Sequence, residues 1–228
     1  MIGEMGYGYG SECHLLRFMG RHRHLLDQRI LAVVGGDSIN WLDFGFDPSK
    51  TWPDAELKGL SFLPEDGAVH DAWKKYWPQG RGIHTWDAVA QVRFGDVEEW
   101  LLVEAKANLE ELRSDCGAKS ARSLATIGRA FDETKWALGV PEDRDWFHGY
   151  YQFCNRIAAL HFLNKHHIPA RLLYIYFVGD KGDARRTCPQ DEREWHDALR
   201  AQEAHVGLPG GHKLEIRMHK VFLPVHKS

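Results

Sequence analysis

The stretch HTWDAVAQVRFGDVEEWLLVEAKA, residues 84–107, consists of two short alternating runs on either side of a Gly-Asp turn. Side chains of a β-strand point alternately to its two faces, so each run presents one apolar face and one more polar face. This pattern predicts a β-hairpin with one wholly apolar face. The apolar positions are Ala88, Ala90, Val92 and Phe94 in the first run and Leu101, Val103, Ala105 and Ala107 in the second.

Charged side chains lie on the opposite face of the predicted hairpin, near its open end. With the turn centred on Asp96 and Val97, Asp87 lies opposite Lys106 and diagonal to Glu104. Neighbouring carboxylates repel, and partly buried charges lose hydration, so this cluster destabilises the strand pair unless it binds a ligand. A hard divalent cation, Mg²⁺ or Mn²⁺, would relieve both penalties.

The hairpin offers the oxygen ligands that Mg²⁺ takes in proteins, namely carboxylates and a backbone carbonyl. We expect the metal ligands to be Asp87, Glu104 and the carbonyl of Ala105. Lys106 would then face the attacking water or the scissile phosphate of a substrate. An alternative is that Glu104 and Lys106 form a structural ion pair at a strand end, which leaves Asp87 on the same face unexplained.

Asp87, followed on the next predicted strand by Glu104-Ala105-Lys106, resembles the active-site motif of the PD-(D/E)XK nuclease superfamily. The resemblance implies a restriction-endonuclease-like core of helix, three strands, helix and strand, and metal-dependent cleavage of phosphodiester bonds. Residues 53–58, PDAELK, spell the motif more fully. In that copy the acids are only two residues apart and no apolar strand leads into Glu56, so we reject it.

Two further residues are candidates through their places in predicted helices. In the resembled superfamily the first core helix often presents a glutamate to the metal, and Glu12 is the only glutamate in the helix predicted over 11–34. The helix macrodipole also accounts for an acid in the first turn. Gln152, on the helix predicted over 145–166, would meet a phosphate or fix the attacking water, and capping of neighbouring carbonyls is an alternative role for it. One branch of the superfamily has Tyr four residues after such a Gln, but here Arg156 follows.

Basic side chains are candidates for contacts with the phosphates of a nucleic acid. Arg156 lies four residues after Gln152 and shares its helix face. Lys119 and Arg122 lie at the start of a helix predicted over 120–138. Capping of neighbouring carbonyls is an alternative role for Arg156, and a solvated helix face is an alternative for the other two.

The remaining periodicity predicts an α/β chain with a mixed central β-sheet flanked by helices. We expect one nuclease-like domain over 1–228, with an irregular insertion at 47–81 and a C-terminal helix-strand extension at 191–228. The tryptophans of the insertion would stack on bases or, in the interpretation that we favour, anchor it on the core. Outside the hairpin, the predicted strands are 38–46, 170–178 and 213–225, and the predicted helices are 11–34, 67–76, 120–138, 145–166 and 191–206.

The composition restricts the class of protein. The chain has 228 residues, of which 43% are hydrophobic and 27% charged, as suits one globular domain. Its formal net charge of -3 argues against an indiscriminate nucleic-acid binder. The four cysteines are too scattered for a zinc ribbon or a disulfide framework, so we expect free thiols. No run is long enough to span a membrane and no signal-peptide pattern is present, so we expect no membrane association and a cytoplasmic location.

The motif and the order of elements predict a Mg²⁺- or Mn²⁺-dependent nuclease that hydrolyses phosphodiester bonds, with DNA as the favoured substrate. A homodimer is expected if both strands of a duplex are cut. The alternative is a catalytically silent module that keeps the nuclease-like fold and binds nucleic acid or a protein partner. The acidic net charge favours that alternative.

Overall fold

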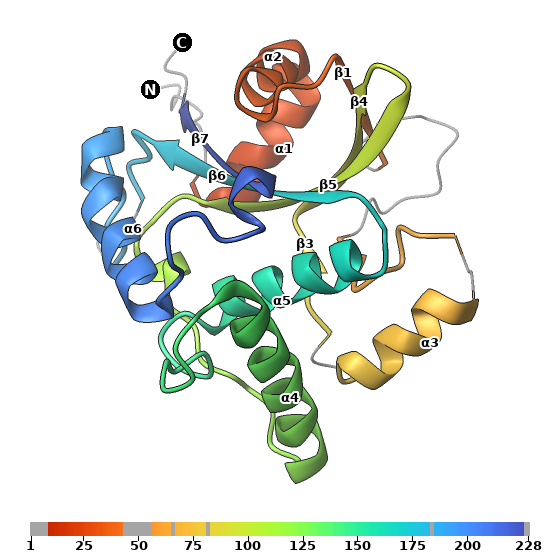
Figure 1. Cartoon of the computed structure of the whole chain (residues 1–228). Coiled ribbons are helices and arrows are strands. Elements are labelled where there is room, and N and C mark those ends of the chain that lie inside the picture. Colours follow the sequence, from red (N-terminus) through yellow and green to blue (C-terminus); the bar gives the residue numbers. More distant parts are fainter. Residues whose placement is uncertain (1–8, 43–55, 65–66, 81–82, 183–184, 226–228) are drawn as a thin grey trace, which may run out of the picture.

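The computed structural model describes residues 9–42, 56–64, 67–80, 83–182 and 185–225, which form a mixed α/β fold (Figure 1). Its strands are β1 (Ser38–Trp41), β2 (Leu57–Lys58), β3 (Thr85–Trp86), β4 (Ala88–Phe94), β5 (Val97–Lys106), β6 (Ala170–Val178) and β7 (Met218–Pro224). Its α-helices are α1 (Ser11–Arg21), α2 (Arg23–Val34), α3 (Gly67–Tyr76), α4 (Ala121–Leu138), α5 (Tyr151–Lys165) and α6 (Glu192–Val206). Two short 3-10 helices are η1 (Glu110–Leu112) and η2 (Glu215–Arg217).

The central element is a five-stranded mixed sheet in the order β1-β4-β5-β6-β7. Strand β4 pairs antiparallel with both β1 and β5, and a two-residue turn joins it to β5. Strand β6 runs parallel to β5, and β7 runs parallel to β6. A parallel pair needs a crossover connection, and here α4 and α5 precede β6 while α6 precedes β7.

The predicted hairpin is present as β4 and β5, but each residue of β4 pairs with a β5 residue two positions earlier than predicted. Phe94 pairs with Val97, so the turn residues are Gly95 and Asp96, and Gly95 has a φ of 59° that suits glycine. The last ladder pair joins Ala88 to Val103, so Asp87 lies just outside the ladder and is not opposite Lys106 as predicted. There it donates its backbone N–H to the Val103 carbonyl and accepts the Ala105 N–H. Because the shift is even, the faces of both strands are unchanged.

Helices cover the two faces of the sheet in two layers (Figure 1). On one face α1 and α2 close an apolar cluster with the inward side chains of β4, β5 and β6. On the other face α5 is central and α4, α3 and α6 lie around it. The helix α5 is buried over most of its circumference, as the apolar residues spread around the helix predict.

Several predicted boundaries are correct to within a residue. The helix α3 and the strand β6 have the predicted bounds. The helices α4 and α6 each begin one residue later, because Ser120 and Asp191 are their N-caps, with side chains that accept backbone N–H groups of the first turn. All four cysteines are free thiols, as predicted. Among the described helices, none is long and apolar enough to cross a membrane.

Three predicted elements are shorter or broken. The helix predicted over 11–34 is interrupted at His22, whose backbone leaves the helical region, and both halves pack on the same face of the sheet. The helix predicted over 145–166 begins only at Tyr151, because the Asp145 carboxylate accepts the backbone N–H groups of Phe147 and His148 and holds a turn there. The last strand begins at Met218, after η2.

The predicted insertion contains α3 and β2 within its described part. Trp73 and Trp77 are buried on the main core and contact each other, which confirms the anchoring role for these two residues. Trp52 lies outside the described residues, as does the part of the first predicted strand beyond 42. The helix α3 is tied to its neighbours by Tyr76, whose hydroxyl contacts Thr134 of α4 and the carbonyl of Ala158 in α5.

Candidate functional site

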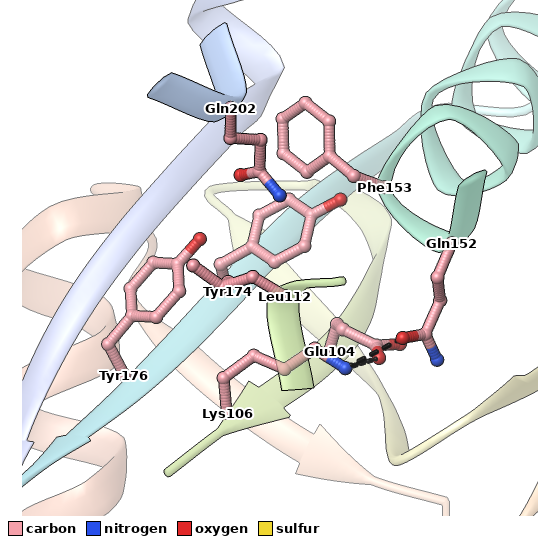
Figure 2. A pocket seen from close by; sticks show the side chains of 8 residues that line it. All are labelled: Glu104, Lys106, Leu112, Gln152, Phe153, Tyr174, Tyr176 and Gln202. Carbon is pink, nitrogen blue, oxygen red and sulfur yellow. Dashed lines mark hydrogen bonds and ion pairs between the residues drawn. The ribbon is translucent and has the colours of Figure 1, made fainter. Parts of the chain in front are cut away.

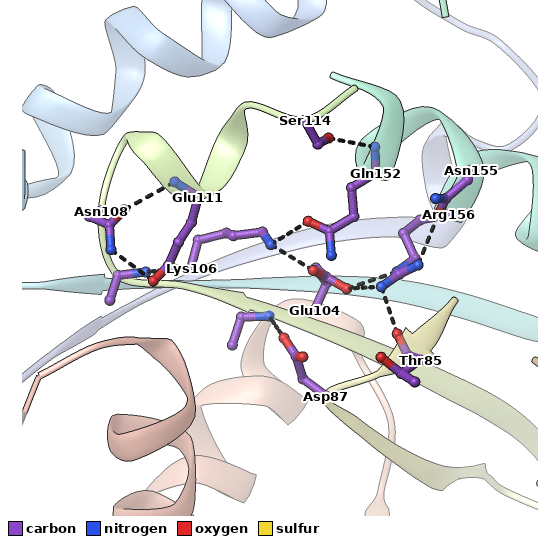
Figure 3. A network of polar contacts seen from close by, with 12 residues as sticks. Thr85, Asp87, Glu104, Lys106, Asn108, Glu111, Ser114, Gln152, Asn155 and Arg156 are labelled. Atoms are coloured by element: carbon purple, nitrogen blue, oxygen red, sulfur yellow. Dashed lines mark hydrogen bonds and ion pairs between the residues drawn. The ribbon is translucent and has the colours of Figure 1, made fainter. Parts of the chain in front are cut away.

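Asp87 lies between β3 and β4, where the chain enters the central sheet. Its backbone N–H donates to the Val103 carbonyl at 3.1 Å, and its Oδ2 accepts the Ala105 backbone N–H at 2.6 Å. The side chain therefore lies against the backbone of the predicted motif (Figure 3). Burial, followed by the nearby charge of Glu104, raises the pKa of Asp87 to about 7, because both effects oppose ionisation.

Glu104 is the innermost charged group of the site. Its side chain is only 1% exposed, and its two oxygens have separate cationic partners. Oε1 accepts from Lys106 Nζ at 2.7 Å, and Oε2 accepts from Arg156 at 2.8 Å (Figure 3). Burial opposes ionisation of Glu104, but the charges of Arg156 and Lys106 outweigh it and lower the pKa of this carboxyl.

Lys106 connects the motif to the helix α5. Besides Glu104, its Nζ donates to Gln152 Oε1 at 2.8 Å. Gln152 is itself held through its backbone N–H, which donates to Ser114 Oγ at 2.8 Å. The structure thus brings together Glu104, Lys106 and Gln152, with Asp87 bound to the backbone of the same strand at Ala105.

Arg156 is held by three hydrogen-bonding partners and one aromatic ring. Its Nη2 donates to the Thr85 carbonyl at 2.6 Å, and its Nη1 donates to Asn155 Oδ1 at 2.8 Å. The guanidinium also lies over the Trp86 ring, 4.9 Å from the ring centroid, and the residue is 2% exposed. The side chain that we expected at the phosphates is therefore buried against Glu104. A polar residue among the apolar residues of α5 indicates that Arg156 has a role, but it does not indicate that Glu104 is the partner.

A small cavity adjoins Lys106 on the side of β6 and α6 (Figure 2). The space in which the centre of a water molecule can lie is about 10 Å³, which is about the smallest that holds one water. The hydroxyls of Tyr174 and Tyr176 are buried there and have no hydrogen-bond partner among the described residues. Both tyrosines lie directly beside the motif, because Tyr174 pairs with Glu104 and Tyr176 with Lys106 in the parallel ladder. We did not predict them, although their spacing of two in an apolar strand places both on one face.

The chain leaves β5 through a closed ring of hydrogen bonds. Glu111 Oε2 accepts the Ala107 N–H at 2.8 Å, and Glu111 Oε1 accepts from Asn108 Nδ2 at 2.7 Å. Asn108 Oδ1 in turn accepts the Glu111 backbone N–H at 3.0 Å. This ring fixes the backbone immediately after Lys106, so the end of the strand is held at the site (Figure 3).

Three predicted site residues lie apart from this network. Glu12 is exposed in the first turn of α1, on the helix layer that covers the opposite face of the sheet. Lys119 and Arg122 are exposed at the N-terminal end of α4. None of the three has a hydrogen bond to Asp87, Glu104 or Lys106 among the described residues, so their roles stay predictions.

The donor set suits a hard cation in its chemistry, because such ions take carboxylate oxygens together with waters. Glu104 lies close enough to Asp87 for its charge to raise the pKa of Asp87. Within the described parts of the chain, no group of three or more His, Cys, Asp or Glu side chains is arranged to hold a metal ion. A cation here would therefore be held by Asp87, Glu104 and oxygens of the backbone, the solvent or a substrate. The Ala105 carbonyl stays the predicted backbone ligand.

The chain was also compared with known proteins. No family model matches it, and neither a curated protein nor a solved structure does.

Proposed function

We propose that this protein is a metal-dependent nuclease that hydrolyses phosphodiester bonds, with DNA as the favoured substrate. The observation that carries the proposal is the meeting of Asp87 with the Glu104-Ala105-Lys106 segment. Asp87 accepts the Ala105 backbone N–H, and Lys106 donates to Glu104. The order of elements, with helices before an antiparallel β1-β4-β5 meander and helices before a parallel β6, is also the order that the resemblance to PD-(D/E)XK nucleases implies.

In this proposal Asp87 and Glu104 hold a Mg²⁺ or Mn²⁺ ion. Such an ion supplies Lewis-acid stabilisation of the charge that develops on the phosphate. Lys106 is fixed by Glu104 and Gln152, which take two of the three Nζ donors, and the remaining donor orients the attacking water or the scissile phosphate. Gln152 acts through Lys106 and is a positioning residue.

Cleavage of supercoiled plasmid and linear DNA in Mg²⁺ or Mn²⁺ tests the proposal, with RNA as a parallel substrate. The wild-type protein should cleave, and Lys106→Ala should reduce the rate by about 10²-fold or more, as expected for loss of a catalytic group. Lys75→Ala removes an exposed lysine of α3 and is the matched control, which should cleave at the wild-type rate. Absence of cleavage, or equal cleavage by Lys106→Ala, would refute the catalytic proposal.

Light scattering under the same conditions tests the homodimer expected for double-strand cleavage.

A second candidate is a catalytically silent module that binds nucleic acid or a protein partner. One observation favours it, since both oxygens of Glu104 already have cationic partners within the protein. Isothermal titration with Mg²⁺ in the presence of a DNA duplex separates the two candidates. A nuclease should bind the ion and lose binding in Asp87→Asn, whereas a silent module should bind the duplex with no dependence on the ion or on Asp87.

A further inference from the structure

The charges of the site already balance without a metal ion. Asp87 and Glu104 contribute two negative charges when both are ionised, and Lys106 and Arg156 contribute two positive charges. Glu104 contacts both cations at 2.7–2.8 Å. A divalent cation that entered this set would add two uncompensated positive charges, and if Asp87 were neutral the excess would be larger.

This excess is severe because the site is buried. Glu104 and Arg156 are 1% and 2% exposed, and Lys106 is 8% exposed. Coulomb interactions between buried charges are several times stronger than in water and are only weakly screened by salt. Both basic side chains therefore repel an incoming cation more strongly than they would at an exposed site.

Arg156 has little freedom to leave when a cation arrives. Its guanidinium donates to Glu104, to the Thr85 carbonyl and to Asn155, and it lies over the Trp86 ring. A solvent-exposed alternative position would break all of these contacts and leave the Thr85 carbonyl without this donor. The positive charge of Arg156 is thus a permanent part of the site.

We infer that Arg156 is a built-in counter-cation that makes divalent-cation binding at Asp87 and Glu104 depend on a bound phosphate group. Each phosphodiester supplies oxygen ligands and carries one negative charge, so it offsets half of the excess of two positive charges that the protein leaves uncompensated. Because coupling between two ligands is reciprocal, the cation should strengthen nucleic-acid binding by the same factor. This inference rests on the proposed nuclease function and assigns Arg156 a positioning role within it.

Electron paramagnetic resonance of free Mn²⁺ measures this coupling directly. Mn²⁺ is titrated into the wild-type protein alone and with a saturating 12-base-pair duplex carrying phosphorothioate linkages, and the binding of Mn²⁺ to the duplex alone is subtracted. The wild-type affinity should rise by about tenfold or more with the duplex, within the usual range of coupling between sites. Equal affinity with and without the duplex overturns the inference but leaves the nuclease proposal standing. No Mn²⁺ binding in either titration defeats both.

Variants separate charge from shape. Arg156→Gln should raise the affinity for Mn²⁺ alone by about tenfold and shrink the coupling, because one buried positive charge is gone. Arg156→Lys keeps the charge and should keep the coupling. Arg193→Gln removes an exposed arginine of α6 and should behave like the wild type. Unchanged or weaker binding of Mn²⁺ alone by Arg156→Gln overturns the inference. If Arg156→Gln does not fold, the wild-type and Arg156→Lys titrations still decide it.

Discussion

The two faces of β5 are both buried, but one is apolar and the other carries charged side chains. On the α1–α2 side, Leu101, Val103 and Ala105 are at most 1% exposed and belong to an apolar cluster. On the α5 side, the alternate positions carry Leu102 and then Glu104 and Lys106, which are also buried. The first face is stabilised by the apolar surface area that it buries, so an apolar side chain of similar size can replace another there.

The charged face is stable only because each charge has a specific partner. Glu104 takes one partner from its own strand and one from α5, and Lys106 takes a second from α5. Removing one member leaves a buried group unpaired, whereas removing a methyl group from the apolar face leaves only a cavity. Loss of a partner on the charged face should therefore destabilise the protein more than truncation on the apolar face.

Arg156→Met should have the largest effect on stability. It leaves the buried Glu104 carboxylate with Lys106 as its remaining cationic partner, and loss of one member of a buried pair costs about 3–5 kcal/mol. Urea unfolding at pH 7.5 in the presence of EDTA measures the change. The expected result is a lower midpoint with an unchanged dependence on urea concentration.

The double variant Glu104→Leu/Arg156→Met is the control for this prediction. It removes the unpaired carboxylate together with its partner, and buried pairs replaced by apolar groups are often no less stable. Lys106 is near enough to the surface to keep Gln152 and gain water. If the double variant is as unstable as Arg156→Met, the cost comes from packing and the contrast between the faces is wrong.

The sequence predicts the two faces of β5 because alternation is a local property. It also predicts that Glu104 and Lys106 share one face, since an even error in the turn preserves parity. For Asp87 the alternation fails, because Trp86 packs on the α5 side and Ala88 on the α1–α2 side, and Asp87 between them bonds to the backbone of β5. The partner of Glu104 was not predictable in this way. Arg156 comes from a helix about fifty residues further along the chain, and only tertiary packing decides whether that helix directs its arginine inward or toward solvent. The tyrosines beside the motif were missed for the same reason, because the β5–β6 pairing is not local.

Leu101→Ala should cost about 3 kcal/mol, because the residue is fully buried and its truncation combines lost burial with a residual cavity. Leu102→Ala, on the other face of the same strand and equally buried, should cost a similar amount. Val97→Ala is the exposed control in β5 and should lie within about 0.5 kcal/mol of the wild type. Thermal or urea unfolding measures all three. A loss at Leu101 below the loss at Val97 would show that the apolar face is not the stabilising one.

Asp87→Asn should stabilise the metal-free protein at high pH. The pKa of Asp87 is raised from 3.8 to about 7 in the folded state, so ionisation of this carboxyl opposes folding. The penalty is absent below about pH 4, grows between about pH 4 and 7, and is constant above that range. Asn keeps an acceptor for the Ala105 N–H without the charge. Since Asp87 is partly exposed, we expect a gain of about 1–2 kcal/mol at pH 8.

Urea unfolding of the wild type and Asp87→Asn between pH 4 and 8, with EDTA, measures this difference. The stability gain should shrink toward zero as the pH falls to about 4, because both proteins are then neutral at this position. Asp96→Asn, which removes an acid at the hairpin turn, is the control. A difference that is constant with pH would show that the charge of Asp87 is not what destabilises the folded state.

Gly95→Ala should have the smallest effect, and it tests the turn that sets the register of both faces. Gly95 has a φ of 59°, and a Cβ added there would have no atom within 4 Å, so the cost comes from the backbone alone. A left-handed conformation costs a non-glycine residue about 1 kcal/mol. Asp96→Ala, next to it in the turn, should cost less, because Asp96 has a negative φ. If the turn were centred on Asp96 and Val97 instead, Gly95→Ala would have no reason to cost more stability than Asp96→Ala. Equal unfolding midpoints for the two variants would therefore argue for a different register, and a register changed by one residue would exchange the charged and apolar faces of β5.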